Sequence, residues 1–298
     1  MSRSNDPGGD LDGSGRPPAA DRTDRRDEPE DRGVSGSTTP AGTTLAIDIG
    51  GTGLKAMVLD SAATPLTDRV RVPTSYPMTP RRLVAALVDL TAPLPSADRA
   101  AVGFPGVVRR GVIRSAPQFD TPDGPSERSD PGLSAKWHGF DLASALAVAL
   151  SIPTRVANDA DVQGLGAITG SGLELVLTLG TGLGSSLFRN GRLAAHLELA
   201  HHPAAKDPSY NQAVGDATRR RVGKKRWRRR VERSLADLDA MIRPDSIVLG
   251  GGNAKRVDLD HLARRFPDTA AKLRVVGNEA GLRGGLGVWF GQASVDFA

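Results

Sequence analysis

Three glycine-rich segments of the sequence could place main-chain N–H groups around an anion. They are residues 50–53, 180–184 and 250–252, and each directly follows a short apolar run. Glycine lets N–H groups converge on an anion because no Cβ atom is in the way, and Thr52 and Thr181 could each add a hydroxyl donor. A tight hairpin accounts for any one of these segments just as well. Three of them in one chain favour the binding of phosphate groups.

Two carboxylates lie where the transfer of a phosphoryl group would need them. Asp48 comes just before the first glycine segment, where it could hold hydrated Mg²⁺, since this ion keeps several waters and takes one or two carboxylates beside phosphate oxygens. Asp159 follows a predicted strand and could accept the proton of a hydroxyl group that attacks phosphorus. Asn158 and Asp159 also suit the N-cap of a helix. The capping and catalytic interpretations are compatible.

A carboxylate and an imidazole, Glu198 and His201, stand three residues apart. On a helical turn they would share one face, and such a pair suits the vicinal hydroxyls of a sugar, although a surface pair explains the spacing too. His202 could be taken for a metal ligand. With no cysteine and five histidines spread along the chain, we expect no zinc site.

Residues 219–230 contain nine basic residues among twelve. Such a run can be a solvated face, a nucleic-acid site or a site for a long polyanion such as polyphosphate. Aromatic residues make up only 4% of the chain, so few are available to stack bases, and nucleic acid is not an expected partner. Arg220, Lys224 and Lys225 are the expected polyphosphate-binding residues of this run.

The 298 residues, 39% of them hydrophobic, are enough for one large domain or two lobes. No apolar run is long enough for a membrane helix, and the N-terminus lacks the apolar stretch of a secretory signal. We therefore expect a cytoplasmic protein without a membrane partner. Residues 1–43 are rich in Gly, Pro, Asp, Arg and Ser, which predicts a disordered tail.

The segment Gly51-Thr52-Gly53-Leu54 recurs as Gly180-Thr181-Gly182-Leu183, each time between two predicted strands. The repeat indicates an internal duplication, and hence two related lobes facing each other across a cleft. Strands that alternate with helices place the chain in the α/β class. Strands are predicted at residues 45–49, 54–59, 101–104, 154–157, 175–179, 185–189 and 247–249, and helices at 80–90, 139–150, 159–168, 226–242 and 278–290.

The P-loop and Rossmann fingerprints for phosphate binding are absent. No Lys-Ser or Lys-Thr follows a P-loop glycine pattern, and no G-x-G-x-x-G opens a helix after the first strand. A P-loop enzyme and a Rossmann dehydrogenase are therefore not expected.

From about Leu45 to the C-terminus the sequence resembles the ROK sugar-kinase family of the actin/hexokinase superfamily. Residues 45–53 and 179–184 are similar to its two phosphate motifs, and residues 250–253 to its motif near the nucleotide. The resemblance implies that these segments contact the phosphates of the donor. The donor-binding residues expected on this basis are Gly50, Gly51, Thr52, Gly53, Lys55, Gly180, Thr181, Gly182, Gly184, Gly250, Gly251 and Gly252.

The sugar motifs of the family also have counterparts. Residues 103–108 are similar to its G-x-P-G segment, Asn158 and Asp159 match the motif with the catalytic Asp, and Glu198 and His201 match its E-x-G-H contacts. The resemblance implies that these four residues hold glucose, with Asp159 as the catalytic base. It also implies Mg²⁺ near Asp48 and a homodimer.

The family fold would give two lobes of ribonuclease-H-like topology, at residues 44–157 and 158–298.

Two departures from the family pattern refine the expected substrates. Ala200 replaces the Gly of E-x-G-H, and the cysteine zinc cluster that usually follows is missing. The branch without zinc is that of the polyphosphate glucokinases, which residues 157–164 and 223–227 resemble. Glucose and polyphosphate are thus the expected substrates.

Two alternatives remain. One is an ATP-dependent hexokinase for another sugar. The other is a sugar-binding regulator, but residues 1–43 lack the apolar periodicity of the helix-turn-helix that such proteins carry.

Overall fold

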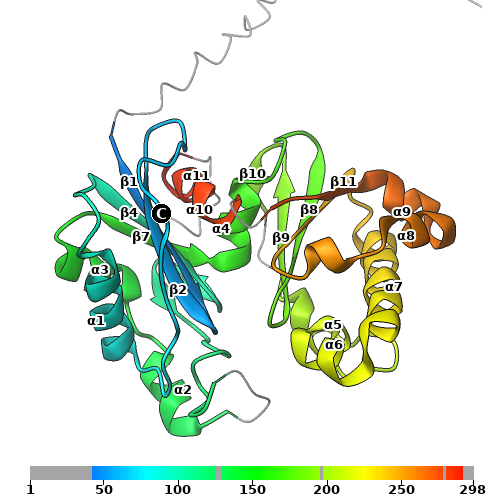
Figure 1. The fold of residues 1–298 in the computed structure, drawn as a ribbon, viewed down its shortest axis with the longest axis horizontal. Helices are drawn as coiled ribbons and strands as arrows, with labels where there is room; N and C mark the ends of the chain where they lie inside the picture. The colour runs from blue at the N-terminus through cyan, green and yellow to red at the C-terminus, as the bar shows by residue number, and fades with distance from the viewer. Residues whose placement is uncertain (1–41, 125–128, 195–196, 278–279, 291–298) are drawn as a thin grey trace, which may run out of the picture. The chain divides into compact units, whose positions relative to one another are not determined.

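The computed structural model describes residues 42–124, 129–194, 197–277 and 280–290. Within these residues, the strands form two five-stranded sheets and one two-stranded sheet, and helices alternate with the strands (Figure 1). This arrangement confirms the predicted α/β class. The tail predicted at residues 1–43 lies outside the described residues, except for its last two positions.

The first sheet has the strand order β3-β2-β1-β4-β7. β1 pairs with β2 in antiparallel fashion, and β1, β4 and β7 run parallel to one another. Its strands are β1 (Thr44–Gly50), β2 (Gly53–Leu59), β3 (Val70–Val72), β4 (Arg99–Phe104) and β7 (Thr154–Asn158). The small third sheet pairs β5 (Val108–Arg109) with β6 (Val112–Ile113).

The second sheet repeats this topology, with the order β10-β9-β8-β11-β12. β8 is antiparallel to β9 and parallel to β11, as β1 is to β2 and β4. The agreement of the two sheets is what an internal duplication would produce. Its strands are β8 (Leu173–Leu179), β9 (Leu183–Arg189), β10 (Arg192–Leu193), β11 (Ser246–Gly250) and β12 (Leu273–Val275).

The helices begin at caps that the sequence supplies. Thr79 accepts a hydrogen bond from the Arg82 N–H group at the start of α1, and Asp141 accepts one from Ser144 at the start of α3. Because Asp141 is the cap, α3 begins three residues later than predicted. The helices are α1 (Pro80–Thr91), α2 (Pro131–Trp137), α3 (Leu142–Leu150), α4 (Asp159–Leu165), α5 (Tyr210–Val214), α6 (Asp216–Val222), α7 (Lys224–Ile242), α8 (Leu259–Arg265), α9 (Pro267–Lys272), α10 (Ala280–Arg283) and α11 (Gly285–Phe290).

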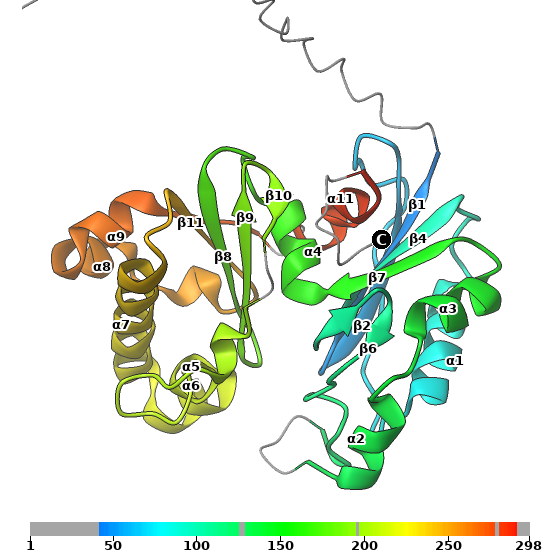
Figure 2. The same ribbon diagram turned by 180° about the vertical axis from the view of Figure 1, so that it is seen from behind.

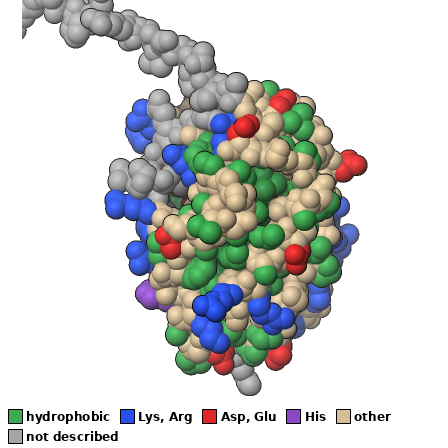
Figure 3. Space-filling model, turned by 90° about the vertical axis from the view of Figure 1, so that its left-hand side faces the viewer, with side chains coloured by type: hydrophobic (Ala, Val, Ile, Leu, Met, Phe, Trp, Pro, Cys, Tyr) green, Lys and Arg blue, Asp and Glu red, His purple; other side chains and the backbone are tan. Residues whose placement is uncertain are grey.

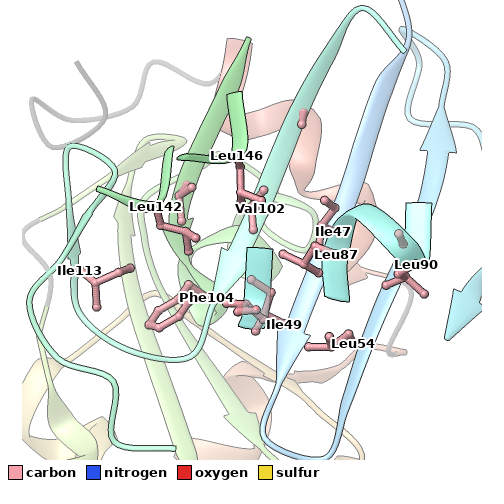
Figure 4. Close-up of a cluster of buried hydrophobic side chains, with 14 of the residues drawn as sticks. Ile47, Ile49, Leu54, Leu87, Leu90, Val102, Phe104, Ile113, Leu142 and Leu146 are labelled. Carbon is pink, nitrogen blue, oxygen red and sulfur yellow. The ribbon is translucent and has the colours of Figure 1, made fainter. Parts of the chain in front are cut away.

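Each sheet has its own apolar core. In the first, Ile47, Ile49 and Leu54 of the sheet pack against Leu87 of α1 and Leu146 of α3 (Figure 4). Full burial of one such side chain stabilises a fold by roughly 1.5–3 kcal/mol. On the side of α1 and α3 that faces away from this core, hydrophobic side chains lie at the surface among separate groups of Lys and Arg (Figure 3).

The second core lies between its sheet and α7. The helix predicted at residues 226–242 is confirmed as α7, and its apolar side chains Trp227, Val231, Leu235 and Leu238 are all buried. The Trp227 indole also donates a hydrogen bond of 2.7 Å to the Val214 carbonyl of α5. α7 therefore holds α5 in place beside the second sheet.

The helix α4 contacts strands of both sheets (Figure 2). Glycines allow this close packing. A Cβ atom on Gly164 would lie 2.4 Å from the ring of Phe188 in β9, and one on Gly284, between α10 and α11, would meet the carbonyl of Val162 in α4. The predicted single helix at residues 278–290 is thus two short helices with Gly284 between them, and both pack against the first sheet.

Among the described residues, no helix combines the length and apolar character needed to cross a bilayer.

Candidate active site

The start of α4 is fixed by Asn158, the last residue of β7. Its Oδ1 accepts hydrogen bonds of 2.9 Å and 3.2 Å from the N–H groups of Ala160 and Asp161. Its Nδ2 donates a 3.0 Å bond to the Gly106 carbonyl in the G-x-P-G segment. Asn158 is therefore a helix cap, as one of the two interpretations predicted, and it also ties α4 to that segment.

Asp159, the first residue of α4, is half-buried. Its Oδ1 accepts a 2.8 Å hydrogen bond from the Ala160 N–H group. Burial, followed by the neighbouring negative charges of Asp48, Asp161 and Glu198, raises the pKa of Asp159 to about 7. A carboxylate with a pKa near the working pH is suited to accept a proton during catalysis.

Asp48 and Lys55 face each other across β1 and β2, and the Lys55 Nζ lies 2.6 Å from the Asp48 Oδ2. Their side chains are 31% and 30% exposed. One oxygen of the predicted magnesium ligand is thus held by Lys55, which leaves Oδ1. No cluster of three potential metal ligands occurs in the described part of the chain. The Asp48 Oδ1 is an oxygen ligand of the kind that Mg²⁺ prefers, since this ion takes few protein ligands and binds mainly water and phosphate.

Two hydroxyl groups hold the first glycine turn, at residues 50–53. The Thr74 Oγ1 donates a 2.7 Å hydrogen bond to the Gly50 carbonyl, and the Tyr76 hydroxyl donates one of 2.7 Å to the Gly51 carbonyl. Burial raises the pKa of Tyr76 to about 12, still further above neutral pH than its usual value, and its protonated phenol is the donor. Sequence reasoning missed both residues, because they lie more than twenty positions from the turn and carry no motif.

The second glycine turn, at residues 180–184, is held from outside its own strands. Asn211 of α5 accepts a 2.9 Å hydrogen bond from the Leu183 N–H group, and the N–H group of Asp216 in α6 donates one of 3.1 Å to the Thr181 carbonyl. A Cβ atom on Gly182 would lie 1.8 Å from the Asn211 Oδ1, whereas one on Gly180 would meet nothing within 4 Å. Gly182 is therefore required for packing, while Gly180 faces open space.

The third glycine segment lies beside the second turn. β8 and β11 are parallel neighbours, so their carboxyl ends meet at one edge of the sheet. The Asn253 N–H group donates a 2.9 Å hydrogen bond to the Leu179 carbonyl, and its Nδ2 donates one of 3.2 Å to the Gly180 carbonyl. Gly251, with a φ of +88°, would bring a Cβ atom within 2.4 Å of the Leu179 carbonyl oxygen. The structure thus brings the second and third segments together.

Glu198 and His201 lie at a 3₁₀ turn (Leu199–His201) after β10. The Glu198 Oε2 is 3.9 Å from the His201 Nε2, and the side chains are 38% and 61% exposed. The negative charge of Glu198 contributes to the raised pKa of Asp159, which places it near that carboxylate. The two predicted sugar contacts therefore lie beside each other, with the Glu198 charge acting on Asp159.

The basic residues of the run at 219–230 fall on two helices. Arg220 of α6 pairs with Asp216 at 2.8 Å, and Lys224 and Lys225, at the start of α7, are exposed. Burial by itself would raise the pKa of Asp216, but hydrogen bonds from Arg219 and Asn253 and the nearby arginine charges lower it overall. Arg219 and Arg220 of α6 therefore pair with Asp216 beside the second glycine turn, and Lys224 and Lys225 add exposed positive charge at the start of α7.

Comparison with known proteins places these features in a family. The model of the ROK family matches residues 44–201. The chain belongs to this family.

Particular relatives can then be named. The chain is 29% identical over 279 residues to the polyphosphate glucokinase of Mycobacterium leprae (strain TN), a match that covers 88% of this chain and 78% of the relative. It is 29% identical over 267 residues to that of Mycobacterium tuberculosis (strain CDC 1551 / Oshkosh), covering 85% and 94%. An N-acetylmannosamine kinase of Escherichia coli (strain SE11) is 33% identical over 156 residues, covering 51% and 49%.

Solved structures show the same fold. The inorganic polyphosphate/ATP-glucomannokinase of Arthrobacter sp. strain KM matches with a TM-score of 0.65 and 29% identity, covering 82% of this chain and 96% of that one. A ROK family glucokinase from Streptomyces griseus, in complex with glucose and AMPPNP, matches with a TM-score of 0.66 and 20% identity, covering 82% and 98%. These matches confirm the two-lobed actin/hexokinase-like fold class.

Proposed function

We propose that this protein is a glucokinase that transfers a phosphoryl group from polyphosphate, and also from ATP, to glucose. The observation that carries the proposal is Asp159, a half-buried carboxylate with a pKa of about 7 at the start of α4. Asp48 and Glu198 lie close enough to raise this pKa. The named relatives that phosphorylate glucose support the choice of substrate.

Each residue has a role in the proposed reaction. Asn158, Glu198 and His201 would hold the sugar, and Asp159 would take the proton of its 6-hydroxyl group. As that oxygen bonds to the terminal phosphorus, the bond from phosphorus to the bridging oxygen breaks, and the shortened phosphate chain leaves with the electron pair. The product is glucose 6-phosphate. The glycine turns would hold the donor through their N–H groups.

Magnesium is part of the proposal. The Oδ1 of Asp48, which bonds to no residue that the structure describes, is the protein ligand that we propose, and the ion would neutralise charge on the donor phosphates. Activity should disappear with EDTA and return with Mg²⁺, whereas a zinc-selective chelator should leave it unchanged. Loss of activity that only zinc restores would contradict this part of the proposal.

The polyphosphate donor is supported by the basic run. Lys224 and Lys225 are exposed, and a long polyanion gains more from such charges than the short phosphate chain of ATP. Changing both lysines to Glu should raise the KM for long polyphosphate far more than the KM for ATP. A control with Arg81→Glu and Arg264→Glu makes the same change of charge at exposed positions elsewhere. Equal effects of the two double variants on polyphosphate would mean that the run is an ordinary solvated face.

One substrate survey tests the whole proposal. Purified protein is assayed with glucose, mannose, fructose, N-acetylglucosamine and N-acetylmannosamine, each with ATP and with polyphosphate. The expected result is the highest kcat/KM for glucose, with both donors used. The partial similarity to N-acetylmannosamine kinases makes that sugar the second candidate, and a preference for it would replace glucose. We also propose the homodimer that the family resemblance implies, which sedimentation of the purified protein tests.

A further inference from the structure

A row of four positions crosses the first sheet beside the first glycine turn. Gly103 of β4 lies opposite Asp48 of β1, Asp48 opposite Lys55 of β2, and Lys55 opposite Arg71 of β3. Directly opposed residues project their side chains from the same face of a sheet. This is the face of Asp159, because a Cβ atom on Gly103 would lie 3.4 Å from the Asp159 Cα.

The charges along this row do not balance. Lys55 is 2.6 Å from the Asp48 carboxylate, but no hydrogen bond or ion pair joins Arg71 to any residue that the structure describes. Like charges directly opposite each other destabilise an antiparallel pair. Lys55 and Arg71 are such a pair, and the one carboxylate of the row, Asp48, lies on the other side of Lys55 from Arg71. An anion beside Arg71 would relieve this repulsion.

The guanidinium of Arg71 lies against the glycine turn itself. A Cβ atom on Gly53 would lie 3.0 Å from the Arg71 Nε and 3.3 Å from its Nη2. The absence of a side chain on Gly53 therefore lets the guanidinium reach the backbone of the turn. A guanidinium can donate two parallel hydrogen bonds to phosphate oxygens. A phosphate group on the N–H groups of this turn would come within reach of that fork.

We infer that Arg71 is a phosphate-binding residue, which with Lys55 and the first glycine turn binds one phosphate group of a phosphoanhydride chain. The inference deepens the proposed function, because it assigns the donor a contact outside the glycine motifs. Sequence reasoning had no signal for it, since Arg71 lies in a three-residue strand that no pattern predicted.

Inorganic tripolyphosphate is the probe, with its Kd measured by calorimetry in the absence of sugar. Arg71→Gln should weaken binding on the order of 10-fold or more, as expected when a hydrogen bond to a charged group is lost. Arg71→Lys keeps the charge but not the fork, and should lie between Arg71→Gln and the unchanged protein. The matched control is Arg81→Gln, an exposed arginine on α1, which covers the other face of the sheet.

Equal Kd values for Arg71→Gln and Arg81→Gln would overturn the inference. Melting temperatures of all variants exclude unfolding as a cause, and an intermediate Kd of a fully folded Arg71→Lys supports the inference independently of Arg71→Gln. The assay needs no turnover. A protein that binds tripolyphosphate through Arg71 but phosphorylates no sugar would refute the proposed kinase and leave this site standing.

Discussion

The first and second glycine turns contain the same tetrapeptide, Gly-Thr-Gly-Leu, but differ in length. In the first, Gly50 pairs with Gly53, so two residues connect the strands. In the second, Leu179 pairs with Leu183, so three residues connect them. The repeated segment has therefore shifted relative to the strands. Matching residues of the two tetrapeptides therefore do not occupy matching positions in the pairing of the strands.

The charges around the two turns differ as well. The residue after the shared leucine lies opposite a residue of the preceding strand in each case. At the first turn Lys55 lies opposite Asp48, and at the second Gly184 lies opposite Thr178. A Cβ atom on Gly184 would lie 2.4 Å from the Thr178 Oγ1 and 3.1 Å from the Ala160 Cβ. The first turn thus carries charged groups on its own strands. The second is packed tightly against α4 and takes its polar contacts from other elements.

The largest expected effect is on Asp159, which lies beside the charged turn. Asp159→Asn should lower kcat by about 10²–10⁴-fold, because it removes the base but keeps a side chain of the same shape. Sugar binding should persist. The matched control is Asp141→Asn at the start of α3, since Asn and Asp cap helices about equally well. If Asp159→Asn kept a kcat near that of the control, Asp159 would only be part of the helix start.

The next largest effects concern two glycines of the second turn, one needed for packing and one expected to bind the donor. Gly182→Ala places a methyl group against Asn211 and should lower the free energy of unfolding by about 1–3 kcal/mol. Gly180→Ala meets no neighbouring atom, so it should keep the melting temperature and raise the KM of the donor, whose phosphate would occupy that space. Equal losses of stability, measured by thermal unfolding, would contradict the tight packing of this turn.

The smallest expected effect is a shift in pH dependence. Only the ionised form of Asp159 accepts a proton, so kcat/KM should fall as the pH drops below about 7, by about tenfold per unit well below the pKa. The Asp48 charge helps to raise this pKa. Asp48→Asn should therefore move the fall in residual activity to lower pH. Thr178→Val, the counterpart in the second turn, should leave its position unchanged.

If Asp48→Asn and Thr178→Val shifted the pH profile by the same amount, the proposed difference between the two turns would be wrong. The direction follows from the raised pKa. Removing a negative neighbour makes the Asp159 carboxylate easier to ionise, and the ionised, active form then persists to lower pH.

Long-range placement could not be read from the sequence in several cases. Asn211, Asp216 and Asn253 support the second turn, but they lie in segments that only the packed second sheet brings to it. The helices α5, α6, α8 and α9 contain five to seven residues each. Segments of this length are too short to show a helical periodicity of apolar residues, so the sequence did not predict these helices.

The sequence by itself determined the local elements of this protein. The alternation of apolar runs and glycines located β1, β8 and their turns, and the four-residue spacing of Trp227, Val231 and Leu235 located α7. These signals are local, because hydrogen bonding and burial within one element set its period. Only the tertiary structure decided that Asp48 and Glu198 lie near Asp159 and raise its pKa. Such a shift depends on burial and on charges brought together through space, which no spacing along the chain encodes.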